Sequence, residues 1–485
     1  MSKSARASRI VALGSVLAFG ASCIPALKQN PPREPNKTVP QSFGASNAGA
    51  QVVGHPEATG PSAGLQNVSD FFSDPDLKAL VDAALSNNQE LNIRLQENLV
   101  AQAEIMSRQG DYIPRLGAFA GAGLEKVGKY TRFGRTDERN NVPKNLQNYT
   151  FGFTASWEVD IWKKLRNAAK AANLRYLSSV EGRNFIITQL VAEIASSYYE
   201  LLALDNKLDV LHTNIGIQQD ALEIVKLQKE AARVTQLAVS RFEAEVLKNK
   251  SRQFEFEQQR IEAENRINFL LGRFPQSVKR NMQSFQTPLP SFISSGVPSQ
   301  LLENRPDVRA AQLALEAAKL DVKSAKANFY PSLSIEANVG YEAFNIKHLV
   351  TTPESLLYNV AGNLAAPLLN RRAIKAMYFQ ANARQLQAVF SYERTLLQAY
   401  TEVVNNLAMI QNLQKSYELR SQQVDALIQS VDISNVLFQS ARADYMEVLL
   451  TRRDSLDAQM ELIATKNEQK QAMVNVYQAL GGGWR

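Results

Sequence analysis

The chain has 485 residues, 21% of them charged, and a formal net charge of +7 at pH 7. This length allows two domains or one elongated one, and this composition is not that of a disordered protein. One cysteine and three histidines far apart in the sequence leave no material for a structural zinc site or for Cys/His catalysis. No basic cluster is interleaved with aromatic residues, so nucleic acid is not an expected partner, and no cofactor or metal is expected.

The N-terminus is typical of an export signal, predicted to cover residues 1–22. Three basic residues precede the apolar run 10–19, which is too short to span a bilayer as a helix. Small residues then precede Cys23, as in a bacterial lipobox, so Cys23 is the predicted lipidation site. Gly20 departs from that motif, which usually has leucine there, and the alternative is ordinary signal cleavage with a free thiol.

The segment 23–66 is rich in Pro, Gly, Ser, Ala and Asn and is expected to be extended. Its composition does not distinguish a tether from a segment laid along a surface. Residues 74–109 are predicted to be helical, with a break at Asn87-Asn88. A matching helix opens at Arg305-Pro306-Asp307, where proline and an acid suit a first turn.

Four strands are predicted from alternating polar and apolar residues, at about 113–127, 147–160, 331–344 and 356–368. Each is about ten residues long, which is what a tilted strand needs to cross a bilayer. A soluble, half-buried sheet would alternate equally well. Aromatic residues at the strand ends and a long polar loop at 126–147 favour the membrane interpretation.

The polar faces of these strands are expected to face a lumen. The lumen-facing candidates are Thr154, Glu158, Glu336 and Glu342. Four strands cannot close a barrel, and an open edge in lipid leaves backbone groups unpaired at several kcal/mol each. Membrane-crossing strands would therefore have to be pooled by several chains, in a number that this argument does not give.

Long helices are predicted at about 164–232, 236–271, 372–440 and 445–480. Their apolar residues recur every three or four positions, near the coiled-coil period. The helix 372–440 would be about 100 Å long, far beyond the mean for globular domains. One register shift aligns the two pairs of helices, so the chain is read as a duplication, with repeats at 67–272 and 301–480, a linker at 273–300 and a tail at 481–485.

Glutamines are frequent away from the apolar seams of these helices. They are Gln218, Gln219, Gln422, Gln423 and Gln429. Two interpretations stay open for them: a polar lumen lining, or an ordinary solvated face of a coiled coil.

Several stretches together carry a resemblance to a known family. They are Asp70-Phe71-Phe72-Ser73-Asp74-Pro75, the run 156–162 (SWEVDIW), the run 301–311 (LLENRPDVRAA), Asn328-Phe329-Tyr330-Pro331-Ser332-Leu333 and Tyr445-Met446-Glu447-Val448-Leu449. In order and spacing the chain resembles the TolC-like outer-membrane efflux proteins, in the lipoprotein branch with OprM and NodT. The resemblance covers nearly the whole chain from about residue 66.

The resemblance implies a mainly α fold with a membrane β-part. Four strands from each of three chains would form one twelve-stranded barrel in the outer membrane, and the helical hairpins would form a periplasmic α-barrel. Such a homotrimer is a passive, lipid-anchored exit duct that docks to a periplasmic adaptor protein and an inner-membrane pump, here expected to be of the RND type. The sequence contains no Gly-rich phosphate loop, so energy would come from the pump.

The resemblance also places a gate at the two helix-to-helix turns, which form the periplasmic tip in this family. The gate candidates are Met446, Glu447, Leu450, Arg453, Leu237 and Ala238. A ring of Glu447 would favour cations, whereas Met446 and Leu450 would add apolar rings. Arg453 could tether neighbouring helices. Relatives often have aspartate at the position of Leu450 and glycine at Ala232 and Ala441, so this gate is expected to be less acidic and its turns stiffer.

Two other classes of function compete with the channel. A periplasmic coiled-coil scaffold or adaptor would explain the helices, but it needs no aromatic-flanked strands of membrane length. An enzyme is not expected, because Glu158 and Asp160 have no histidine, cysteine or metal-ligand partner nearby in the sequence.

Overall fold

The computed structural model describes residues 24–27, 31–40, 43, 62–287, 296, 298–369, 371–440 and 442–484. They form two compact units. The first contains 98–178 and 312–391 with the described residues up to Pro35; the second contains 179–311, 392–484 and the described part of 36–97. The predicted signal 1–22 and the predicted lipidation site Cys23 lie outside the described residues.

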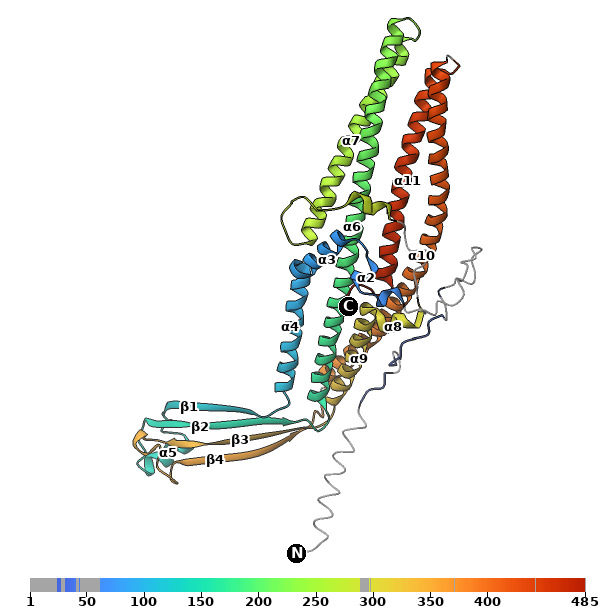
Figure 1. Cartoon of the computed structure of the whole chain (residues 1–485). Helices are drawn as coiled ribbons and strands as arrows, with labels where there is room; N and C mark the ends of the chain where they lie inside the picture. Colours follow the sequence, from blue (N-terminus) through green and yellow to red (C-terminus); the bar gives the residue numbers. More distant parts are fainter. Residues whose placement is uncertain are drawn as a thin grey trace. The chain divides into compact units, whose positions relative to one another are not determined.

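A four-stranded antiparallel sheet in the first unit has the order β1-β2-β3-β4 (Figure 1). The strands are β1 (Arg115–Glu125), β2 (Leu146–Val159), β3 (Ser332–Ala343) and β4 (Leu356–Ala365). The residues between β1 and β2, expected to be a polar loop, contain a short helix, α5 (Arg132–Arg139). A turn of 3-10 helix, η4 (Ile346–His348), lies between β3 and β4.

Helices join the sheet at one end only. Helix α4 (Gln89–Gly110) precedes β1, α6 (Lys164–Glu230) follows β2, α9 (Pro306–Ala327) precedes β3 and α10 (Arg372–Gln439) follows β4. Because neighbouring strands are antiparallel, all four junctions share one end of the sheet, and the two strand-to-strand loops share the other. No helix among the described residues has a stretch long and apolar enough to cross a membrane.

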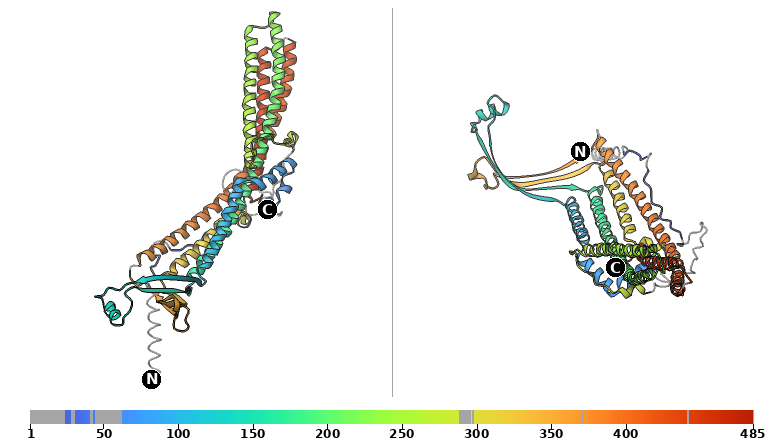
Figure 2. Two further views of the ribbon diagram at one scale, coloured as in Figure 1. Left: turned by 90° about the vertical axis from the view of Figure 1, so that its left-hand side faces the viewer. Right: turned by 90° about the horizontal axis from the view of Figure 1, so that it is seen from above.

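Two helical hairpins dominate the second unit. Helix α7 (Gln236–Leu270) returns beside the C-terminal part of α6, and α11 (Tyr445–Ala479) returns beside that of α10 (Figures 1 and 2). Arg252 and Asp457 form an ion pair of 2.9 Å between α7 and α11. The predicted fold class, long helical hairpins with four strands per chain, is confirmed.

Shorter elements complete the second unit. They are α2 (Val68–Phe71), α3 (Pro75–Asn87), α8 (Leu301–Asn304) and the 3-10 turns η1 (Ala63–Leu65), η2 (Met282–Gln286) and η3 (Pro298–Gln300). Asp74 caps α3, since its carboxylate accepts the backbone N–H of Asp76 at 2.9 Å, and a proline occupies the first turn.

The apolar seam predicted for α6 is buried throughout. Its members are Leu190, Ile194, Tyr198, Leu201, Leu204, Leu208, Leu211 and Ile215. The seam of α10 is looser, because Val403 and Val424 are buried whereas Leu407, Ile410, Leu413, Leu427 and Val431 are half-buried. Burial of a core apolar side chain stabilises a fold by about 1.5–3 kcal/mol, so the α6 seam contributes more to the core.

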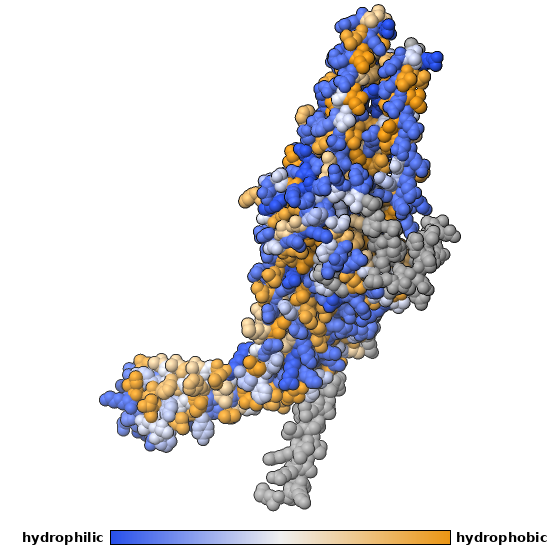
Figure 3. All heavy atoms as spheres, in the orientation of Figure 1, coloured by the Kyte–Doolittle hydropathy of each residue, from blue (hydrophilic) through white to orange (hydrophobic). Residues whose placement is uncertain are grey.

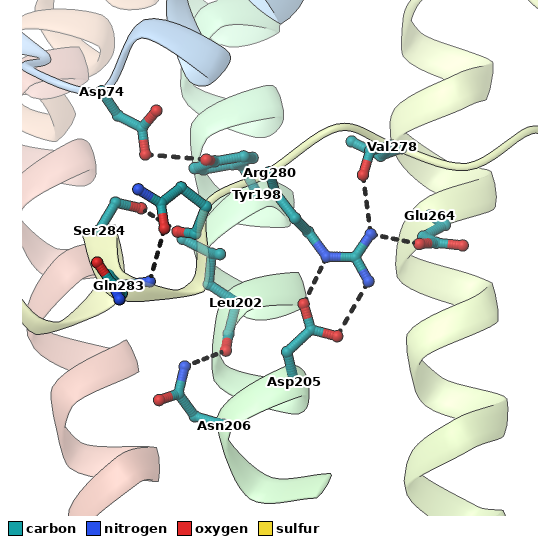
Figure 4. A network of polar contacts seen from close by, with 11 residues as sticks. Asp74, Tyr198, Leu202, Asp205, Asn206, Glu264, Val278, Arg280, Gln283 and Ser284 are labelled. Carbon is teal, nitrogen blue, oxygen red and sulfur yellow. Dashed lines mark hydrogen bonds and ion pairs between the residues drawn. The ribbon is translucent and has the colours of Figure 1, made fainter. Parts of the chain in front are cut away.

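Ion pairs attach the linker between the repeats to the first hairpin (Figure 4). Arg280 forms a two-point pair with Asp205 of α6 at 2.5 and 3.0 Å, and it also reaches Glu264 of α7 at 2.5 Å. Burial by itself lowers the pKa of Arg280, but the hydrogen bonds and charges of both carboxylates outweigh burial and raise it. The linker therefore bridges the two helices of the first hairpin.

Further contacts hold the middle of this linker, at Phe285 and Thr287. Phe285 of η2 is fully buried, and the Lys470 ammonium donates to the carbonyl of Thr287 at 2.8 Å. Burial lowers the pKa of Lys470 to about 8, and the charge of Lys466 adds to this effect. The Tyr198 hydroxyl donates to Asp74 at 2.8 Å, and burial followed by this bond raises the pKa of Tyr198 (Figure 4).

The described part of the N-terminal segment is laid along α10 and not left as a tether. The Gln385 amide donates to the carbonyl of Arg33 at 3.0 Å, and the Arg33 guanidinium lies over the Phe390 ring at 4.7 Å. Further along, Phe43 stacks on Tyr400 with ring centroids 5.7 Å apart. These contacts place Arg33 and Phe43 against α10.

Candidate functional site

The sheet has one polar and one apolar face, and the register of its strands shows which residues share each face. In one row across the sheet, Gly117, Thr154, Asn338 and Asn359 are paired in turn. In the next row, Ala118, Phe153, Val339 and Tyr358 are paired. Because neighbouring residues of a strand point to opposite faces, the two kinds of row alternate along the strands. One row of the polar face is an exception, because it consists of Phe119, Gly152, Gly340 and Leu357.

The register places all four predicted lumen residues on the polar face. Glu336 pairs with Ser156, Glu342 with Thr150 and Glu158 with Ser334, in the same set of rows as Thr154. The Asn148 amide donates to Glu342 at 2.8 Å. Glu158 forms an ion pair with Lys164 at the start of α6, so its charge is balanced within the chain. That this face lines a lumen stays a prediction.

Large side chains of the apolar face are exposed in the single chain. Phe153 is 58% exposed, Val360 76% and Tyr358 78%. Phe151 stacks on Tyr341 with ring centroids 5.5 Å apart. Figure 3 shows apolar side chains gathered over these strands. A contiguous exposed apolar face of this kind marks an interaction with a partner or with a membrane.

Both outer edges of the sheet are open. Strands β1 and β4 each pair with one neighbour only among the described residues, so the other side of each strand presents unpaired backbone N–H and C=O groups. Such an edge is a template for pairing with another strand, and inside a bilayer it costs several kcal/mol per unpaired group.

The first hairpin end is a tight turn between α6 and α7. The backbone N–H of Arg233 donates to Gln228 O at 2.8 Å, and Ala232 has a φ of 55°, which is left-handed. Leu237 is 55% exposed, whereas Ala238 has no exposed surface and lies in a small core with Val225 and Phe242. Of these two gate candidates, Leu237 presents a side chain to the outside and Ala238 supports the turn.

The second hairpin end repeats this turn, with Arg442 N–H donating to Leu437 O at 2.8 Å. Glu447 and Leu450 are exposed, and they line a shallow groove between α10 and α11. Met446 is half-buried, and the Arg241 guanidinium approaches its sulfur at 2.7 Å, which links the two hairpins. Ala441 lies outside the described residues.

The arginines that follow differ in their surroundings. Arg453 pairs with its neighbour Asp454 at 3.3 Å, so among the described residues it tethers no other helix. Arg452 is half-buried and donates to Asn435 of α10 at 2.9 Å, while its Nε and one Nη have no partner among the described residues. Burial lowers the pKa of Arg452. Sequence reasoning missed this residue, and the only signal was a second arginine in the hairpin seam.

The five glutamines named in the sequence also differ in burial. Gln218 is neither lumenal nor solvated, because it is buried inside the first hairpin, where Asn249 donates to its carbonyl oxygen at 2.9 Å. Gln219, Gln422, Gln423 and Gln429 are exposed. Within the described ranges, no three His, Cys, Asp or Glu side chains come together as ligands for a metal ion.

Comparison with known proteins assigns the chain to a family. A family model described as "Outer membrane efflux protein" matches residues 80–273 and 297–482. The pyoverdine export outer membrane protein OpmQ of Pseudomonas aeruginosa is 27% identical, over 87% of this chain and 90% of the relative. The probable outer membrane lipoprotein SilC of Salmonella typhimurium is 24% identical, over 93% and 94%. The solved open state of the MtrE outer membrane channel of Neisseria gonorrhoeae superposes with a TM-score of 0.81 at 22% identity, over 94% of this chain and 98% of that chain.

Proposed function

The chain belongs to the outer membrane efflux protein family, and from this premise we propose that three copies assemble into the exit duct of a tripartite efflux system. The chain is an outer-membrane protein with a large periplasmic helical part. Three four-stranded sheets would close one twelve-stranded barrel, and the hairpins of three chains would surround a periplasmic channel.

The open sheet edges carry this proposal. Edge pairing of β1 in one copy with β4 in the next satisfies the backbone groups that each chain leaves unpaired. The same closure turns the apolar face with Phe153 and Tyr358 toward lipid, and the polar face with Thr154 and Glu336 toward the lumen. A coiled-coil scaffold in the periplasm would have no use for the exposed apolar face.

The channel is proposed to be passive. The hairpin ends would dock to a periplasmic adaptor, and an inner-membrane pump of the RND type would supply the energy. The exposed side chains of Leu237, Glu447 and Leu450 support a gate at these ends. The apolar Leu450 and the non-glycine turn at Ala232 favour a gate that opens less readily than a glycine-containing one.

A lipid anchor at Cys23 belongs to the same proposal. It is supported by the small residues before the chain's only cysteine and by the name of the lipoprotein relative. Acyl chains anchor by burying CH₂ groups, at about 0.8 kcal/mol each.

The first experiment is native mass spectrometry of the full-length protein extracted in detergent. A trimer that conducts ions in a planar bilayer is the expected result. A clean monomer would leave the strands with open edges, and the channel proposal would then be wrong in its central claim.

A further inference from the structure

Helix α5, between β1 and β2, has no role in the channel function proposed above. The junctions of the sheet with α4, α6, α9 and α10 are all at its opposite end, so α5 lies at the end with the strand-to-strand loops. With the helical part in the periplasm, and if the sheet crosses the membrane as proposed above, this end faces the outer leaflet and the cell exterior. Hydrophilic side chains gather at this end in Figure 3, where Figure 1 labels α5.

This segment is a built structure and not a loose loop. The Thr131 hydroxyl caps α5 by accepting Gly134 N–H at 3.1 Å, and it donates to Gly128 O at 2.8 Å. A Cβ atom at Gly134 would overlap the backbone of Gly128, so glycine is what allows the helix to pack so closely on the segment before it. An ion pair of 2.8 Å between Lys129 and Glu138 adds a second connection.

Three arginines share one face of this helix. Arg132, Arg135 and Arg139 are spaced by three and four residues, so their side chains follow one side of the helix, and all three are exposed. The buried Gly134 lies on the opposite side. No ion pair or side-chain hydrogen bond joins these guanidinium groups to another part of the chain that the structure describes.

The surroundings of this arginine face are basic and aromatic, which corrects the statement from the sequence that no basic cluster is interleaved with aromatic residues. The residues 126–147 contain six lysines and arginines but only two acids, and one of those acids, Glu138, is already paired. Tyr130 and Phe133 are 87% and 70% exposed. Tyr130 precedes α5 and Phe133 lies within it, and exposed aromatic rings are enriched at the boundary between lipid and water.

We propose that the face formed by Arg132, Arg135 and Arg139 binds the phosphate groups of lipid headgroups in the outer leaflet. The inference rests on the proposed barrel, which brings this end of the sheet to the membrane surface. A planar guanidinium binds phosphate through two parallel hydrogen bonds, and three of them fixed on one helix face can hold a phosphate-rich headgroup. The aromatic side chains Tyr130 and Phe133 would lie against the acyl boundary.

The test compares the full chain with the variant R132Q/R135Q/R139Q. Both are incubated in detergent with lipid A, whose phosphate groups carry net negative charge, or with phosphatidylcholine, whose phosphate charge is balanced by choline. Retained lipid is read by native mass spectrometry. Wild type is expected to retain lipid A, and the variant at least about tenfold less, because the charge-assisted bonds are lost. Equal retention of lipid A by the two proteins would overturn the proposal, as would retention of phosphatidylcholine by wild type as strong as its retention of lipid A.

A charge-matched control uses three other exposed basic residues, Arg384, Arg394 and Lys415, which lie on α10 away from the sheet loops. Their joint replacement by glutamine is expected to leave lipid A retention unchanged, and a similar loss in this control would show that general charge, not the α5 face, binds the lipid. The same spectra report the oligomer. A monomer in every protein would refute the barrel, whereas trimers with arginine-independent lipid binding would refute only this inference.

Discussion

The two faces of the sheet can be tested with a pair of neighbouring residues on β2. Phe153 is near the middle of β2, on the apolar face, and it pairs with Val339 of β3. Replacing Phe153 with arginine would put a charge at mid-bilayer on the lipid side. The penalty there is about 2–4 kcal/mol for each chain, and it counts three times in a trimer.

Thr154 is the matched control, because it occupies the next position and the opposite face. It pairs with Gly117, which has no side chain, and with Asn338. An arginine at this position would have room, and Glu336 is only one row away on the same face. We expect a cost of about 0.5 kcal/mol or less, because the new side chain stays in water, where substitutions usually have effects of that size.

The assay is the fraction of heat-resistant trimer in outer-membrane extracts, measured on seminative gels at equal expression. Phe153→Arg should remove most of the trimer, and Thr154→Arg should leave it near the wild-type level. Phe153→Leu should be close to neutral, because the side chain stays apolar and Phe153 is not packed inside a core. Equal losses for the two arginine variants would refute the assigned facing.

Three further predictions concern the helical part. Arg280→Gln leaves two partly buried carboxylates without their partner and should lower the free energy of unfolding by about 3 kcal/mol, measured by denaturant unfolding in detergent. The Lys470 pKa of about 8 lies below the usual 10.5, so the unfolded chain binds more protons than the folded one between these values. Lys470 should therefore contribute about 2–3 kcal/mol of added stability between pH 8 and 10.5, and Lys470→Met should remove that contribution. Glu447→Gln should lower the cation-to-anion permeability ratio about twofold or more, read from reversal potentials in planar bilayers.

Each of these predictions has a control measurement. Lys279→Gln removes the neighbouring charge, which is 90% exposed and pairs with Asp76, and should change stability by less than about 1 kcal/mol. If Lys279→Gln and Arg280→Gln are equally destabilising, the linker is not fastened by Arg280. Glu418→Gln removes an exposed acid from α10 outside the turn, and it should leave selectivity unchanged. If the stability of Lys470→Met varies with pH as that of wild type does, Lys470 is not the source of the pH dependence.

Periodicity predicted the elements well because the physical constraint is local. Alternation identified β2 and β3, since one face is apolar from Tyr149 to Val159 in β2 and along the whole of β3. Three- and four-residue spacing identified the seam of α6, and its members are buried. These patterns need no knowledge of the partner, only of which side of an element is covered.

The features that sequence reasoning missed depend on distant partners. Helix α5 has a visible cap in Thr131, but Gly134 argues against a helix until its close approach to Gly128 is known. The sequence left Gln218 as either a lumen-lining or a solvated residue, yet the Asn249 amide donates to it inside the hairpin. Arg280 lies in the predicted linker 273–300, and its role comes from its ion pair with Asp205 of the preceding hairpin.

The duplication explains why contacts can be repeated when residues are not. The Asn88 amide, just before α4, donates to Leu270 O at the end of α7 at 2.8 Å. In the second repeat the corresponding donor is Arg305, which reaches Ala479 O at the end of α11 at 3.1 Å. A helix end leaves carbonyls without intrahelical partners, and each repeat supplies one donor to the same place.

The glycines after these helices follow the same logic. Gly272 and Gly481 have φ values of 66° and 83°, and a Cβ on either would overlap the backbone carbonyl of the residue two positions before α4 or α9. The backbone requirement is therefore shared, while the donor side chain is free to change. Arg305 can then do more than Asn88, since it also pairs with Asp307 at 2.7 Å and joins α10 through Glu402. A weak sequence match between repeats is thus compatible with the same hydrogen bond, because the constraint acts on the helix end and not on the residue that satisfies it.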